Sequence, residues 1–200
     1  MAATASPYGL KAVNHLGGTP YAGSTRMYPI ASGYANNIYN GSIVSVVAAG
    51  TIVFTAAVGT AAAPFQAGTV GVFVGCTFTD PNSGNVVFRQ NWPTGTVAAD
   101  ALAYVVDDPA AIFQVQANGA VVAADLGQCC SIIAQTTNTG TLSSGNSTTA
   151  VNAATTSVNA DAFKIVGFVD SPTSTVGDAF TDLLVKFNPA AHAYTSGTGI

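Results

Sequence analysis

The stretch that decides the fold is 69–117, TVGVFVGCTFTDPNSGNVVFRQNWPTGTVAADALAYVVDDPAAIFQVQA. Apolar residues recur at every second position in its first part, which is the period of a β-strand that turns one side to a core. We therefore expect one common face for Val70, Val72, Val74, Cys76 and Phe78. The polar run DPNSGN at 80–85 is typical of a chain reversal, because its residues preset φ, tolerate positive φ or bond their own backbone. A returning strand is expected at 86–90.

Two more strands complete this β-meander, at 104–106 and 112–116, where β-branched and aromatic residues gather on either side of Asp107-Asp108-Pro109. Similar runs, bounded by turn residues, predict short strands elsewhere in the chain. They lie at 43–47, 51–55, 120–124, 131–135 and 163–169.

The segment 178–187 is compatible with either a short helix or a strand. Asp182 and Lys186 are four residues apart, as in a helical ion pair, but the alternation of Leu183, Val185 and Phe187 favours a strand. The Thr- and Ser-rich tract at about 136–160 is of low complexity and is expected to form an exposed loop or short edge strands. Together these patterns predict an all-β fold, an antiparallel β-sandwich or β-barrel of short strands.

The N-terminal residues 1–40 differ in character from the rest. Prolines, glycines and serines interrupt any periodicity, which predicts an extended N-terminal arm in front of a β-rich body at 41–200. The arm carries five tyrosines, a residue that suits contacts on a partner surface. An irregular segment packed on its own domain is the alternative. We expect no signal peptide, because MAATASPYGLK lacks a charged start followed by an apolar run.

Charge is sparse: 7% of the residues are charged, where roughly 25% is usual, and Glu is absent. The net charge is −4, and only Lys11 and Arg26 are charged before Asp80. So few charges cannot cover a free globule in the usual way, which indicates a surface made for other protein. Five basic residues are too few for a nucleic-acid-binding stripe. The uncharged stretch 27–79 is interrupted by glycines and Pro64, so we expect no membrane span.

The sequence contains no catalytic motif. His15 and His192 lie in the two terminal segments, so a histidine-assisted nucleophile would require both ends to converge on one pocket. Asp107 and Asp108 are adjacent, and neighbours on a strand face opposite sides, so capping of the turn is favoured over acid–base chemistry.

Calcium binding by this aspartate pair with Asp80 or Asp125 is an alternative, although the spaced ligands of a known calcium loop are missing. The three cysteines, two of them adjacent, are expected to be buried small hydrophobes. We therefore expect no enzyme, no catalytic residue, no cofactor and no metal.

Three segments of the second half carry a resemblance: YVVDDPAAIFQVQANG at 104–119, AADLGQ at 123–128 and FKIVGFVDSPTSTVGDAFTDLLVKFNPAAHAY at 163–194. In order and spacing they resemble tailed-bacteriophage virion proteins, particularly the capsid decoration (cement) proteins. The resemblance covers a little under half of the chain, and this chain has Ala, Thr and Ser where many members of the group carry charged residues.

The resemblance implies a β-rich protein on the outer surface of the virion capsid, in many copies, bridging neighbouring major capsid protein subunits. Contacts with neighbouring copies, as a dimer or trimer, would fit this arrangement. The expected contact residues are Tyr8, Lys11, His15, Tyr21, Arg26 and Tyr28. The alternatives are an interface on the body, a tail or head-fibre component, and a glycan-binding β-sandwich for host adhesion with Trp92 and Tyr104 as its aromatic platform.

Overall fold

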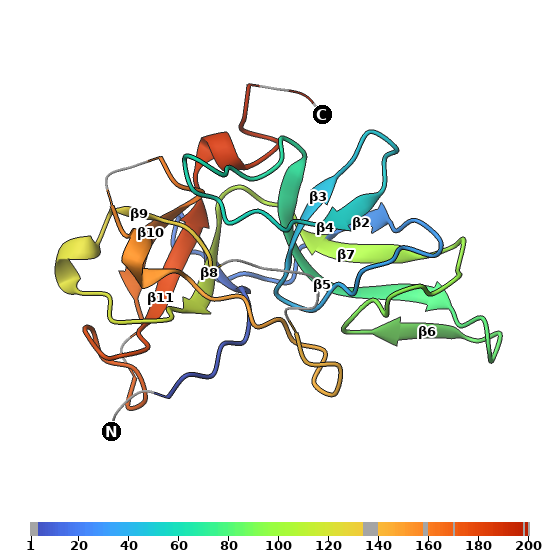
Figure 1. Cartoon of the computed structure of the whole chain (residues 1–200), viewed down its shortest axis with the longest axis horizontal. Helices are drawn as coiled ribbons and strands as arrows, with labels where there is room; N and C mark the ends of the chain where they lie inside the picture. Colours follow the sequence, from blue (N-terminus) through green and yellow to red (C-terminus); the bar gives the residue numbers. More distant parts are fainter. Residues whose placement is uncertain (1–3, 134–139, 158–159, 170, 198, 200) are drawn as a thin grey trace.

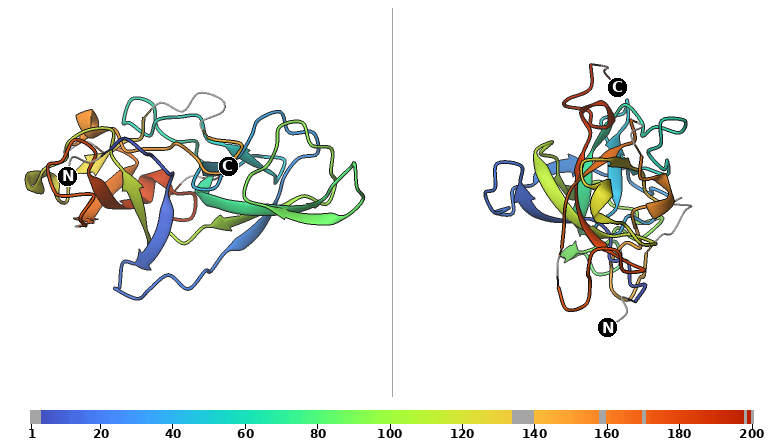
Figure 2. Two further views of the ribbon diagram at one scale, coloured as in Figure 1. Left: turned by 90° about the horizontal axis from the view of Figure 1, so that it is seen from below. Right: turned by 90° about the vertical axis from the view of Figure 1, so that its left-hand side faces the viewer.

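The computed structural model describes residues 4–133, 140–157, 160–169, 171–197 and 199, and it is built from two antiparallel sheets that pack as a β-sandwich. The smaller sheet has the order β1 (Lys11–His15), β8 (Ala111–Gln116), β11 (Asp182–Phe187), β10 (Phe163–Phe168), β9 (Cys129–Cys130). The larger sheet has the order β2 (Arg26–Pro29), β7 (Leu102–Val106), β5 (Thr69–Thr79), β3 (Ile43–Val46), β4 (Ile52–Phe54). The two sheets lie at opposite ends of an elongated molecule (Figures 1 and 2).

The strands expected in the central stretch are present, but they do not form one β-meander: β6 (Val86–Arg89) and β7 both pair with β5, and β8 lies in the smaller sheet. β6 returns along the far half of β5, and Thr79 lies opposite Val86 across the turn. The backbone N–H of Asp80 donates to the carbonyl of Asn85, and its carboxylate accepts from the N–H of Asn82, so the turn is closed by the residues that predicted it. The strands expected at 43–47, 51–55, 163–169 and within 178–187 are also present.

The common face expected along β5 is wrong, because β5 contains two bulges. In the pairing with β3, Val70 is an additional residue of β5 that is skipped between Thr69 and Gly71. In the pairing with β7, Val74 is skipped in the same way between Phe73 and Gly75. Each bulge reverses which side the following residues face. Val72 therefore packs in the core of the smaller sheet with Val74 against it, whereas Val70, Cys76 and Phe78 pack in the core of the larger sheet.

The chain has two hydrophobic cores: one lies on the smaller sheet and also contains Ile43, Val72 and Val106 from strands of the larger sheet, and the other lies within the larger sheet. The core of the smaller sheet contains three aromatic side chains in mutual contact, Phe65, Phe163 and Phe187. In the larger sheet Trp92 is completely buried and meets Phe78 edge to face at 5.2 Å between ring centroids. β2 and β4 are the first and last strands in the order of this sheet. A parallel bridge between Ile30, which follows β2, and Ile52 of β4 brings these two edges together, so the sheet curls around its core.

The described part of the expected N-terminal arm, 4–40, pairs with the body and does not stand apart from it. β1 pairs with β8 in the smaller sheet, and β2 pairs with β7 in the larger sheet. Most of the prolines and glycines that suggested an arm lie in the connections around these two short strands, and Pro29 is the last residue of β2. This part of the chain therefore corresponds to the alternative of a segment packed on its own domain.

Three further expectations need correction. No strand forms at 120–124; a 3-10 turn, η1 (Ala123–Asp125), replaces it, and the Asp125 carboxylate accepts a hydrogen bond from the N–H of Val122. The strand expected at 131–135 does not form at 131–133, where Ile132 makes only an isolated bridge with Val151; β9 ends just before it, at Cys130, and 134–135 lie outside the described residues.

The low-complexity tract is described at 140–157 and at 160, and it contains the 3-10 turn η2 (Ala153–Thr155). Ala150 and Val151 are buried, so the tract supplies part of the core and the expectation of full exposure is wrong there. Within the described residues, no helix is long and apolar enough to span a membrane.

Candidate functional site

An apolar surface on the larger sheet is the first candidate site. β2, β7, β5 and β6 turn one side to solvent, and the strand register places Met27 opposite Tyr104 and Thr77 opposite both Leu102 and Phe88. We call this surface the outer face and define it by Met27, Val86, Phe88, Leu102 and Tyr104. Val86 is 73% exposed, Phe88 62% and Met27 57%. None of the five residues is charged.

The outer face owes its shape to a glycine in the second bulge of β5. Gly75 has φ 154°, and a Cβ atom there would lie 2.7 Å from the ring of Phe88. Phe88 can therefore lie flat across the sheet, with its ring centroid 5.9 Å from that of Tyr104. An uncharged patch of this kind is typical of a contact surface for another protein.

The turn between β7 and β8 gathers three of the six contact residues predicted from the sequence, His15, Arg26 and Tyr28. Asp107 Oδ2 lies 2.9 Å from Nε of Arg26 and accepts a hydrogen bond of 2.8 Å from the hydroxyl of Tyr28. Asp108 Oδ2 lies 3.1 Å from Nδ1 of His15, while its Oδ1 accepts from the N–H of Ala110. The two carboxylates take different partners, and Asp108 does cap the turn.

The C-terminal segment reaches the same turn. The hydroxyls of Tyr194 and Tyr28 are hydrogen-bonded to each other, and the guanidinium of Arg26 lies 5.3 Å from the centre of the Tyr194 ring. His192 is buried, and its Nδ1 accepts from the N–H of Tyr194. β2 and the C-terminal segment thus meet at this turn, a contact between distant parts of the chain that the sequence did not predict.

The electrostatics of this cluster suit a structural role. Burial, the hydrogen bond from Tyr194 and the contact with Asp107 all raise the pKa of Tyr28. Burial lowers the pKa of His192 below its usual value. At neutral pH the phenol therefore keeps its proton and the imidazole stays neutral. The cluster fastens β2 and the C-terminal segment to the β7–β8 turn.

The other predicted contact residues lie elsewhere or are turned inward. The Tyr8 hydroxyl donates to Asp182 on β11, and the Lys11 ammonium lies 5.7 Å from the centre of the Tyr8 ring. Burial raises the pKa of Tyr8. Tyr21 packs beside His15, with ring centroids 5.8 Å apart. Most of these side chains thus contact other segments of their own chain.

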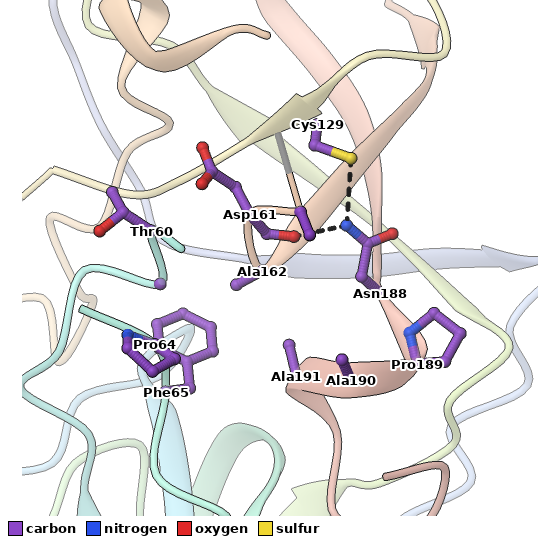
Figure 3. A pocket seen from close by; sticks show the side chains of 12 residues that line it. Thr60, Pro64, Phe65, Cys129, Asp161, Ala162, Asn188, Pro189, Ala190 and Ala191 are labelled. Carbon is purple, nitrogen blue, oxygen red and sulfur yellow. Dashed lines mark hydrogen bonds between the residues drawn. The ribbon is translucent and has the colours of Figure 1, made fainter. Parts of the chain in front are cut away.

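A cavity of about 440 Å³ forms the second candidate site, at the end of the smaller sheet (Figure 3). It is lined by the loop 59–65, by Cys129 of β9, by residues 160–162 just before β10 and by the 3-10 turn η3 (Pro189–Ala191). The side-chain amide of Asn188 donates to the carbonyl of Asp161, and it lies 3.3 Å from the sulfur of Cys129. These bonds tie the walls of the cavity together.

The calcium site and the aromatic platform that the sequence suggested find no support in the geometry. Among the described residues, no group of three His, Cys or Asp side chains could hold a metal ion. Trp92 lies inside the core, so the expected aromatic platform of Trp92 and Tyr104 is wrong. No family model, curated protein or solved structure was found to match the chain.

Proposed function

We propose that this protein is a structural component of a bacteriophage virion, which binds the outside of the capsid and stabilises the lattice of the major capsid protein. The observation that carries the proposal is the exposed, uncharged outer face of Met27, Val86, Phe88, Leu102 and Tyr104. The sparse charge of the whole chain and its resemblance to decoration proteins point the same way. The partners would be the major capsid protein and neighbouring copies of this chain.

The outer face can supply useful binding energy. Full burial of a Phe, Met or Val side chain contributes about 1.5–3 kcal/mol, so side chains that are half to three-quarters exposed can each contribute about 1–2 kcal/mol. Ordering two molecules costs several kcal/mol, so one copy would bind only moderately. A ligand that binds only the assembled lattice stabilises it by mass action, and many copies repeat the effect.

The test is co-sedimentation with capsids of the phage that encodes the chain, purified without this protein. Phe88→Ser removes the most exposed aromatic ring of the outer face and is expected to weaken binding at least tenfold. Leu126→Ser is the matched control: Leu126 is 54% exposed and follows η1, at the end of the molecule opposite β6 (Figure 1). Failure of the unaltered protein to sediment with capsids, or equal binding of both variants, would overturn the proposal.

Copy number separates the head from the tail. Hundreds of copies per virion support a capsid protein, and a dozen or fewer support a tail or head-fibre component. Host adhesion through glycans is the remaining alternative. Tyr104 on the outer face keeps it open, and binding on a glycan array that Phe88→Ser abolishes would favour it.

A further inference from the structure

The cavity beside η3 has a carboxylate in its wall. Asp161 is only 4% exposed, yet it takes part in neither of the two ion pairs found among the described residues, His15 with Asp108 and Arg26 with Asp107. Buried carboxylates are normally paired with a cation or fully hydrogen-bonded, because an isolated buried charge is costly. Asp161 is therefore a group to which a positively charged ligand can contribute a missing partner.

The carboxylate is held in position from two sides. Its Oδ1 accepts a hydrogen bond of 3.0 Å from the N–H of Ala61, and the backbone carbonyl of Asp161 accepts from the amide of Asn188. A carboxylate has about four acceptor positions, and Ala61 uses one of them. Thr60, whose hydroxyl accepts from the N–H of Ala63, lies on the same side of the cavity (Figure 3). Two oxygen-bearing side chains thus lie together in one wall.

The remaining wall is apolar and rigid. Most of it is formed by Pro64, Phe65, Ala162, Pro189, Ala190 and Ala191. The Phe65 ring is fixed edge to face against Phe163 at 5.8 Å and against Phe187 at 6.4 Å between ring centroids. The cavity volume of about 440 Å³ lies within the range of roughly 300–1,000 Å³ typical of small-molecule sites, which are mostly apolar with a few fixed polar groups.

We propose that this cavity binds a small organic ammonium compound, with its charged nitrogen at Asp161 and its apolar body against Phe65 and η3. Preformed walls and a carboxylate already held by Ala61 reduce the ordering cost of binding. This site is separate from the outer face, and its occupancy does not depend on capsid binding.

The experiment compares 2-phenylethylamine with 2-phenylethanol, which has the same apolar body and no charge. Binding to the full chain is followed at neutral pH by amide chemical shifts in NMR spectra. The amine is expected to shift the amides of Ala61 and Ala162, which adjoin Asp161, and to bind at least tenfold more tightly than the alcohol, a difference of about 1.4 kcal/mol. No binding of the amine, or equal binding of the two compounds, would overturn the proposal.

Two variants of equal charge locate the ammonium group. Asp161→Asn keeps an oxygen for the N–H of Ala61 and removes the charge, and it is expected to reduce amine affinity at least tenfold. Asp178→Asn makes the same change in net charge at a residue that caps a turn by accepting from the N–H of Thr175, outside the cavity, and should bind as the unaltered chain does. Equal affinities of the two variants would refute the role of Asp161. The comparison of amine and alcohol on the unaltered chain decides the matter even if Asp161→Asn does not fold.

Discussion

Gly71, beside the first bulge of β5, offers the sharpest test of how the two cores are joined. It has φ 150°, and a Cβ atom there would overlap the carbonyl oxygen of Val106, lie 2.9 Å from the carbonyl carbon and lie 3.1 Å from Cα of Asp107. These atoms are backbone and cannot rotate away, so Gly71→Ala must push β5 and β7 apart. Backbone strain costs about 1–3 kcal/mol and overpacking costs about 1–3 kcal/mol, so Gly71→Ala is expected to lower the free energy of unfolding by about 2–6 kcal/mol.

Gly84→Ala is the matched control for this substitution. Gly84 also has positive φ, 69°, but a Cβ atom there meets nothing within 4 Å, so only the backbone strain of about 1–2 kcal/mol is expected. Urea unfolding of both variants is followed by the fluorescence of Trp92, which is buried and is the sole tryptophan of the chain. If the two free energies of unfolding differ by less than about 0.5 kcal/mol, the proposed close contact between β5 and β7 is refuted.

Three predictions concern the side chains around the C-terminal segment and the cavity. Tyr194→Phe removes one hydrogen bond to Tyr28 and should lower the free energy of unfolding by about 1 kcal/mol; an unchanged urea midpoint would contradict it. A thiol reagent should modify Cys129 before Cys130, because Cys130 is buried and burial raises its pKa; equal rates in peptide mapping would count against this. The free energy of unfolding should fall as the pH decreases from 7.5 towards 5.5. Burial lowers the pKa of His192 in the folded chain, so the unfolded chain binds the proton at a higher pH than the folded chain does. The slope of the free energy of unfolding against pH is then at most about 1.4 kcal/mol per pH unit. A flat stability profile in that range would refute the last prediction.

The strands of the central hairpin were predictable because their signals are local, whereas β1 and β2 lie where the sequence predicted an arm. The alternation in 69–79 and the DPNSGN turn both depend on neighbouring residues, and both appear in the structure as β5 and its hairpin with β6. The sequence also contains the signal for the outer face: Val86 and Phe88 are two positions apart, as are Leu102 and Tyr104, so the members of each pair face the same side of a strand. What was missing was the register, which decides that these pairs share one side.

The features that escaped prediction depend on contacts between distant segments. Gly71 and Gly75 inside a strand are a recognised sign of bulges, but only pairing with β3 and β7 shows where the facing reverses. The contact of Tyr28 with Tyr194 joins residues 166 positions apart. Asp161 likewise bonds Ala61 across 100 positions, so no local pattern could predict the cavity.

The division of the chain between the two sheets sets an order for folding during synthesis. All six strands of the larger sheet come from 26–106, so its pairings are available as soon as that stretch has left the ribosome. β8 lies between β1 and β11, so one of its edges waits for residues 182–187. An open strand edge invites pairing with other chains. In the interval between translation of β8 and emergence of β11, this edge of β8 is therefore open to pairing with other chains.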